Sequence, residues 1–162
     1  MIDGDGRVTQ EIVLPQTRDR VFDFLVDAEM LARWLGTGAE LEPKPGGIFR
    51  FEVAPGQLCE GRYVEVDRPG RVAFTWGWSD PWWDVPPGGS LVEIELTEVA
   101  GGATKLTLVH SGLPGSVRAL HDEGWVTFLE RLTAVASGRD PGAYRDADPV
   151  ERKRILDQGT AP

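Results

Sequence analysis

Apolar and polar residues alternate with a two-residue period along much of the chain, which is typical of half-buried β-strands. Residues 7–14 are rich in β-branched and apolar side chains and end at Pro15, which predicts a first strand. Residues 48–53 (IFRFEV) and 72–78 (VAFTWGW) alternate most regularly, with their aromatic rings on one side. These runs predict an antiparallel sheet with one apolar face.

Further runs extend the sheet. Residues 91–99 (LVEIELTEV) and 105–110 (KLTLVH) alternate in the same way, and the Gly-Gly pair between them predicts a hairpin turn. Residues 58–66 also predict a strand, but their apolar side chains do not fall on one side. Either a β-bulge or a half-polar interior explains that irregularity.

Helical spacing occurs in two places. Thr17 is a candidate N-cap for a short helix, in which apolar residues recur at helical spacing over residues 21–26. After a break near Asp27 the spacing continues over residues 30–35. The longest helix is predicted from about Ser116 to Ser137. Its apolar stripe comprises Val117, Leu120, His121, Gly124, Trp125, Phe128, Leu132 and Val135.

The order of elements predicts an α+β domain over residues 1–138: one strand, one or two short helices, about six more antiparallel strands and a long helix. Only the long helix can cover the apolar face of the sheet, and a pocket is expected between the two. Residues 139–162 form a polar extension, in which Asp148–Glu151 predicts the start of one short helix.

Composition excludes several functions. With 17 basic and 26 acidic residues the formal net charge is −9, which disfavours binding to nucleic acids or anionic membranes. No stretch approaches the roughly 18 apolar residues of a membrane span. Residues 1–7 lack the apolar core of a signal peptide, and the single Cys59 excludes an internal disulfide, so we expect a cytoplasmic location. The preference for Arg over Lys suggests a GC-rich bacterial source.

Few residues offer catalytic or metal-binding chemistry. His110 and Ser111 are neighbours on a strand and point to opposite faces, so they make a poor base–nucleophile pair. Two histidines and one cysteine give no metal-ligand spacing, and Cys59 is most simply a core thiol. We predict no catalytic residue, no metal and no cofactor.

The predicted pocket instead suggests binding. Both His110 and His121 face inward, either bonded to backbone groups at the rim or in contact with a ligand. Trp82 and Trp83 lie in a proline-rich loop and either pack on the domain, cover the pocket or contact a second copy. The predicted ligand-binding residues are Trp34, Phe49, Phe51, Phe74, Trp76, Trp78, His110, Leu113, His121 and Trp125.

Several segments, in order, resemble those of one family. They are residues 46–51 (GGIFRF), 60–66 (EGRYVEV), 72–76 (VAFTW), 104–113 (TKLTLVHSGL) and 121–132 (HDEGWVTFLERL). Together they resemble the activators of the heat-shock-protein-90 ATPase and their bacterial homologues, in the START-like (SRPBCC) superfamily. The resemblance extends from about Arg7 to Gly138.

This resemblance implies a helix-grip fold, like that of START domains and the birch-pollen allergen: a curved sheet of about seven strands around a long C-terminal helix, with a hydrophobic cavity. It leaves three functions open, because a fold does not fix an activity. The first is binding of a small hydrophobic or aromatic molecule without chemistry. The second is a cyclase or hydrolase that uses a cavity histidine. The third is co-chaperone action in the stress response, with a chaperone partner; a homodimer is also left open.

Overall fold

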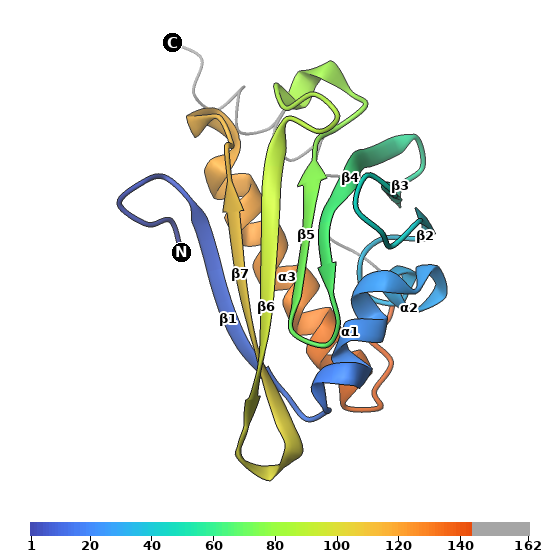
Figure 1. Ribbon diagram of the computed structural model, residues 1–162. Coiled ribbons are helices and arrows are strands. Elements are labelled where there is room, and N and C mark those ends of the chain that lie inside the picture. The colour runs from blue at the N-terminus through green and yellow to red at the C-terminus, as the bar shows by residue number, and fades with distance from the viewer. Residues whose placement is uncertain (144–162) are drawn as a thin grey trace.

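Seven antiparallel strands form one curved sheet, in the order β1-β7-β6-β5-β4-β3-β2 (Figure 1). The computed structural model describes residues 1–143. The strands are β1 (Val8–Leu14), β2 (Gly38–Leu41), β3 (Ile48–Ala54), β4 (Gln57–Asp67), β5 (Arg71–Trp76), β6 (Ser90–Val99) and β7 (Ala103–Ser111). The helices are α1 (Arg18–Val26), α2 (Ala28–Ala32) and α3 (Gly115–Ala136), with two short 3-10 turns, η1 (Pro81–Trp83) and η2 (Ala100–Gly102).

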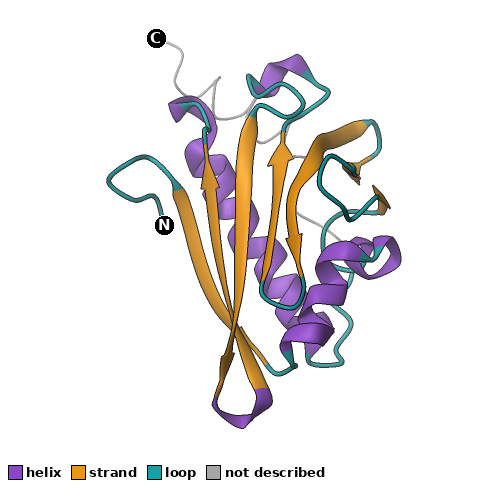
Figure 2. Cartoon of the chain, in the orientation of Figure 1, coloured by secondary structure: helices purple, strands orange, loops and turns teal. Residues whose placement is uncertain are grey.

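The long helix α3 crosses one face of the sheet, and α1 and α2 lie beside its C-terminal half (Figures 1 and 2). Its buried side chains follow the predicted stripe, including Val117, Trp125 and Leu132. The predicted start and end of this helix are each displaced by one residue. The helix-grip fold and its α+β class are therefore confirmed.

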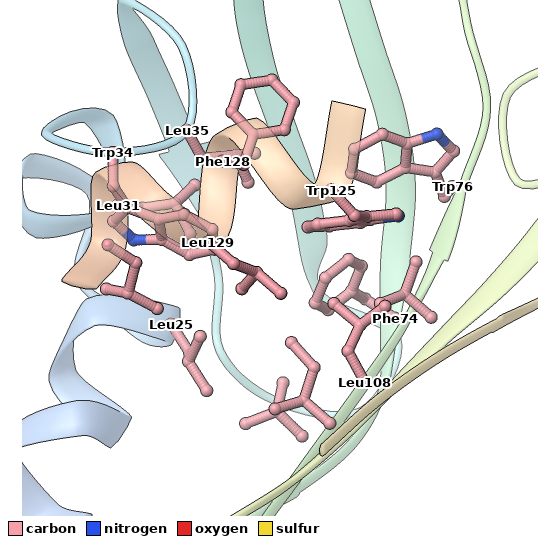
Figure 3. Packing of buried hydrophobic residues seen from close by; sticks show 14 of the residues in the cluster. Leu25, Leu31, Trp34, Leu35, Phe74, Trp76, Leu108, Trp125, Phe128 and Leu129 are labelled. Carbon is pink, nitrogen blue, oxygen red and sulfur yellow. The ribbon is translucent and has the colours of Figure 1, made fainter. Parts of the chain in front are cut away.

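Aromatic side chains dominate the core between the sheet and the helices. Phe49 stacks on Phe74, with ring centroids 3.8 Å apart and an interplanar angle of 15°. Phe51 contacts Trp76 at 5.2 Å, and Trp76 in turn contacts Trp125 on α3 at 5.1 Å. Figure 3 shows Trp125 beside Trp76 and near Phe74. The alternating rings of β3 and β5 thus face inward, as their spacing predicts.

The irregular pattern of β4 comes from a bulge. Tyr63 pairs with Phe74 and Glu65 pairs with Ala73, so Val64 is the extra residue on this strand. Val64 is 51% exposed. Of the two explanations left open by the sequence, the structure supports the bulge.

Capping residues set the two short helices. The Thr17 hydroxyl accepts a hydrogen bond from the Arg20 amide, which confirms the predicted N-cap. Asp27 ends α1, and its carboxylate caps α2 by accepting from the Met30 amide at 3.0 Å.

The helix predicted at Asp148–Glu151 lies outside the described residues. None of the helices within residues 1–143 is sufficiently long and apolar to span a membrane.

Candidate functional site: a tryptophan–histidine cluster

Two histidines meet where the first turns of α3 cross the sheet. His110 comes from β7 and His121 from α3, and their ring centroids are 5.3 Å apart. Neither ring is more than 6% exposed. The indoles packed around them are those of Trp76, Trp78, Trp83 and Trp125.

Both ring nitrogens of His121 are used in hydrogen bonds. Its Nδ1 lies 2.8 Å from the Val117 carbonyl oxygen, which can only accept, so Nδ1 carries the proton. Its Nε2 accepts from the indole nitrogens of Trp78 at 3.1 Å and Trp76 at 3.4 Å. Burial lowers the pKa of His121 to about 4, although the bond to the Val117 carbonyl opposes this shift. The imidazole is therefore neutral at pH 7.

His110 is held in the opposite tautomer. Its Nδ1 accepts from the Trp125 indole at 3.0 Å, and because an indole can only donate, the proton sits on Nε2. That Nε2–H donates to the Ser90 hydroxyl at 2.8 Å, and the hydroxyl donates to the Trp76 carbonyl at 2.8 Å. Burial, and secondarily the neighbouring His121, hold the pKa of His110 well below its ordinary value.

The contact between Ser90 and His110 has the spacing of a catalytic dyad but the wrong proton arrangement. A base that activates a serine must accept the hydroxyl proton at the facing nitrogen. Here that nitrogen is the donor, and the Ser90 proton points to the backbone. Ser90, rather than the adjacent Ser111, contacts His110, and the sequence gives no sign of this because Ser90 reaches His110 only through the pairing of β6 with β7.

A small cavity of about 40 Å³ adjoins the cluster between β5, the β5–β6 loop and α3. It is lined by Val53, Trp76, Trp78, Trp83, Leu120, His121, Gly124, Trp125 and Phe128. Among the described residues, no carboxylate, lysine or arginine lines it. A wall of this composition offers apolar contacts and no group that would compensate a buried charge.

Four of the ten predicted ligand-binding residues line this cavity: Trp76, Trp78, His121 and Trp125. The other six are buried elsewhere in the core. Trp34, for example, donates from its indole to the Phe24 carbonyl at 3.0 Å and so attaches the segment after α2 to α1. His110 supports the cavity through the Trp125 indole without lining it.

The loop after β5 supplies a residue that the sequence left ambiguous. Trp83 is 3% exposed and stacks on Trp78, with centroids 4.7 Å apart and an interplanar angle of 18°. Its ring also contacts His121 at 5.3 Å. Figure 1 shows this loop at the end of the sheet where α3 begins. Trp83 thus packs on its own domain and forms one wall of the cavity.

Cys59 is fully buried, and burial raises the pKa of its thiol well above the ordinary value. Such a thiol stays protonated and is a poor nucleophile. Within residues 1–143, no three metal-ligating side chains come together. Neither observation adds catalytic groups to the cavity.

A curved antiparallel sheet closed by one long helix over an aromatic cavity defines a helix-grip protein of the START-like type. The particular family follows from the sequence: the family described as "Activator of Hsp90 ATPase homolog 1-like protein" matches residues 15–137, and the chain belongs to it. No curated protein matches the chain.

Solved structures agree with this assignment. The AHSA1-like protein RHE_CH02687 from Rhizobium etli is 41% identical, with 91% of this chain and 96% of that chain covered and a TM-score of 0.66. PFC0360w, an HSP90 activator from Plasmodium falciparum, is 26% identical, with 80% of this chain and 96% of that chain covered and a TM-score of 0.66. DynU16, encoded in the dynemicin biosynthetic locus, is 26% identical with a TM-score of 0.71. The match covers 86% of this chain but only 50% of DynU16.

Proposed function

We propose that this protein binds a small apolar or aromatic molecule between the start of α3 and the adjacent end of the sheet, without transforming it. The observation that carries the proposal is the composition of the cavity wall, in which four indoles surround a space with no charged side chain among the described residues. Such a wall gains binding energy from buried apolar area, at roughly 25 cal/mol per Å², and from ring stacking.

The state of the histidines argues for binding over chemistry. His121 is the only titratable group among the described residues that line the cavity, and both of its nitrogens are engaged. A general base needs a free nitrogen within reach of the substrate and a pKa near the working pH. The engaged nitrogens and the low pKa of His121 meet neither requirement.

A ligand must enlarge the cavity in order to enter. The space of about 40 Å³ is well below the roughly 300–1,000 Å³ of typical small-molecule pockets. The least buried large side chain of the wall is that of Leu120, which packs on the core but is only partly buried. We infer that ligand entry displaces the Leu120 side chain, while the strands, the Trp83 ring and the hydrogen-bonded histidines stay in place.

Tryptophan fluorescence tests the proposal, because four of the six tryptophans line the cavity. The emission spectrum is expected to shift on titration with a flavonoid, a fatty acid or an aromatic polyketide, and the shift should saturate. Trp76→Ala should weaken the binding, whereas Val126→Ala, on the exposed side of α3, should not. Native mass spectrometry of the purified protein would identify any co-purified molecule. Turnover of a bound ligand, or no saturable binding across the panel, would contradict the proposal.

Family membership supplies a second candidate, in which the domain stimulates the ATPase of a heat-shock-protein-90 chaperone. The observation in its favour is the similarity to the Plasmodium falciparum HSP90 activator. A steady-state ATPase assay with a bacterial chaperone of this class tests it directly. We expect no stimulation by this domain alone; stimulation that depends on its concentration would move the assignment to co-chaperone.

A further inference from the structure

One buried hydrogen-bond donor in the cavity wall has no acceptor. The indole Nε1 of Trp83 is buried and bonds to nothing among the described residues. The neighbouring indoles of Trp76, Trp78 and Trp125 all donate to a histidine. Since a buried donor without a partner is unfavourable, the exception at Trp83 points to an acceptor outside the described residues, and a bound ligand would supply one.

The position of Trp83 is fixed, so its free donor is not a result of a loose loop. The Asp80 carboxylate accepts from the Trp82 amide at 3.0 Å and caps η1. The Trp83 ring itself is held between Trp78 and His121. These contacts orient the indole before any ligand arrives, which reduces the entropy lost on binding.

Water is a poor candidate for the missing acceptor. An ordered buried water needs two to four polar partners. The other polar side chains that line the cavity are already used, because the Trp76, Trp78 and Trp125 indoles each donate to a histidine and both His121 nitrogens are engaged. A ligand oxygen attached to an apolar ring system needs only the one donor.

Gly124 gives a second, independent indication that the cavity is kept open. It lies in the middle of α3, where glycine is less favourable than alanine. A Cβ at this position would meet nothing within 4 Å, and Gly124 lines the cavity. Helix stability therefore favours alanine here, whereas glycine leaves room for an occupant.

We propose that the ligand is a neutral, planar apolar molecule with a carbonyl or phenolic oxygen, and that this oxygen accepts a hydrogen bond from the Trp83 indole. This inference rests on the proposed function and adds the chemical class of the ligand. The oxygen is neutral because no cation lines the cavity among the described residues, so a carboxylate would be buried without compensation.

A pair of isosteric probes tests the hydrogen bond. Fluorenone carries a ring carbonyl where fluorene carries a methylene group. Fluorenone should bind the wild-type protein about tenfold more tightly, as expected when an unsatisfied buried donor gains an acceptor. Trp83→Phe keeps a ring but removes the N–H, so this variant should bind fluorenone and fluorene with about equal affinity. Its affinity for fluorene should match that of the wild-type protein. Fluorene-9-carboxylate should bind more weakly than fluorenone.

Two further measurements keep the test independent of how well that variant folds. In the wild-type protein, the indole N–H signal of Trp83 in a ¹⁵N-correlation spectrum should move downfield with fluorenone and not with fluorene. Gly124→Ala should raise the unfolding free energy and weaken binding of both probes, with Val126→Ala as the matched control on the exposed face. Equal affinity for the two probes, or an unmoved Trp83 signal, overturns this inference and leaves the proposed function standing. Failure of both probes to bind counts against the proposed function itself.

Discussion

Acidification should destabilise the domain through its buried histidines. His121 has an ordinary pKa of 6.5 when exposed and about 4 in the fold. Between these values the unfolded chain binds a proton that the native state does not, so the unfolding free energy falls as the pH drops. Each unit by which the native pKa lies below the unfolded pKa corresponds to about 1.4 kcal/mol of unfolding free energy. His121 therefore accounts for about 3 kcal/mol lost between pH 6.5 and pH 4. The pKa of His110 is lowered as well and adds to the loss in the same direction.

Urea denaturation at pH 7.0, 6.0, 5.0 and 4.5, followed by tryptophan emission, measures this loss as a fall in the unfolding free energy. His121→Gln is the informative variant, because its amide oxygen can still accept from the Trp76 and Trp78 indoles but does not titrate. It should be less stable than wild type at pH 7 and should lose less stability on acidification. Val126→Ala should keep the wild-type slope.

Two results would refute this reasoning. One is a wild-type unfolding free energy that does not change between pH 6.5 and pH 4.5. The other is an NMR titration in which the His121 ring of the native protein gains a proton near pH 6.5. Either result would mean that the imidazole is accessible to water, and the assignment of its Nδ1 and Nε2 bonds would have to be revised.

Other substitutions test separate parts of the fold. Trp125→Ala should cost roughly 3–5 kcal/mol, as for a buried large aromatic, and a loss below about 1 kcal/mol in chemical denaturation would show that α3 does not cover the core as described. Gly77→Ala should lower the unfolding free energy by about 1–3 kcal/mol through overpacking, because its Cβ would overlap the Pro86 carbonyl oxygen; an unchanged melting temperature would contradict that contact. Cys59 should resist Ellman's reagent in the native protein and react on unfolding; rapid native labelling would mean that its surroundings open. Removal of the residues after Arg139 should leave a cooperatively folded domain by circular dichroism, and loss of folding would assign the tail a structural role.

Regular alternation made most of the sheet predictable from the sequence. Side chains alternate between the two faces of a strand, so the rings of residues 48–53 share one face, as do those of residues 72–78. Because that face is the apolar one, its burial follows from the sequence, and the structure confirms it. The strand β2 was missed, since four residues that include a glycine and a glutamate give too short a pattern. The bulge at Val64 depends on the pairing with β5 and could not be resolved from β4 alone.

The candidate site was only partly predictable, because its chemistry depends on contacts between distant segments. The inward direction of His110 and His121 followed from their spacing. Their tautomers did not, since these are fixed by Trp125 on α3 and by the Val117 carbonyl one turn before His121. The unsatisfied donor of Trp83 has no signature in the sequence, because any loop tryptophan could have bonded to a neighbouring backbone group.

The pairing of β1 with β7 has a consequence for synthesis of the protein on the ribosome. The first strand finds its neighbour only after nearly all of the sheet has been made, and α3 follows later still. Folds dominated by such distant pairings form slowly, and until α3 emerges the aromatic face of β3 and β5 lacks the long helix that covers it. A nascent chain that stops before Gly115 therefore presents a broad apolar surface, which is the feature that general chaperones bind and that drives aggregation when they are absent.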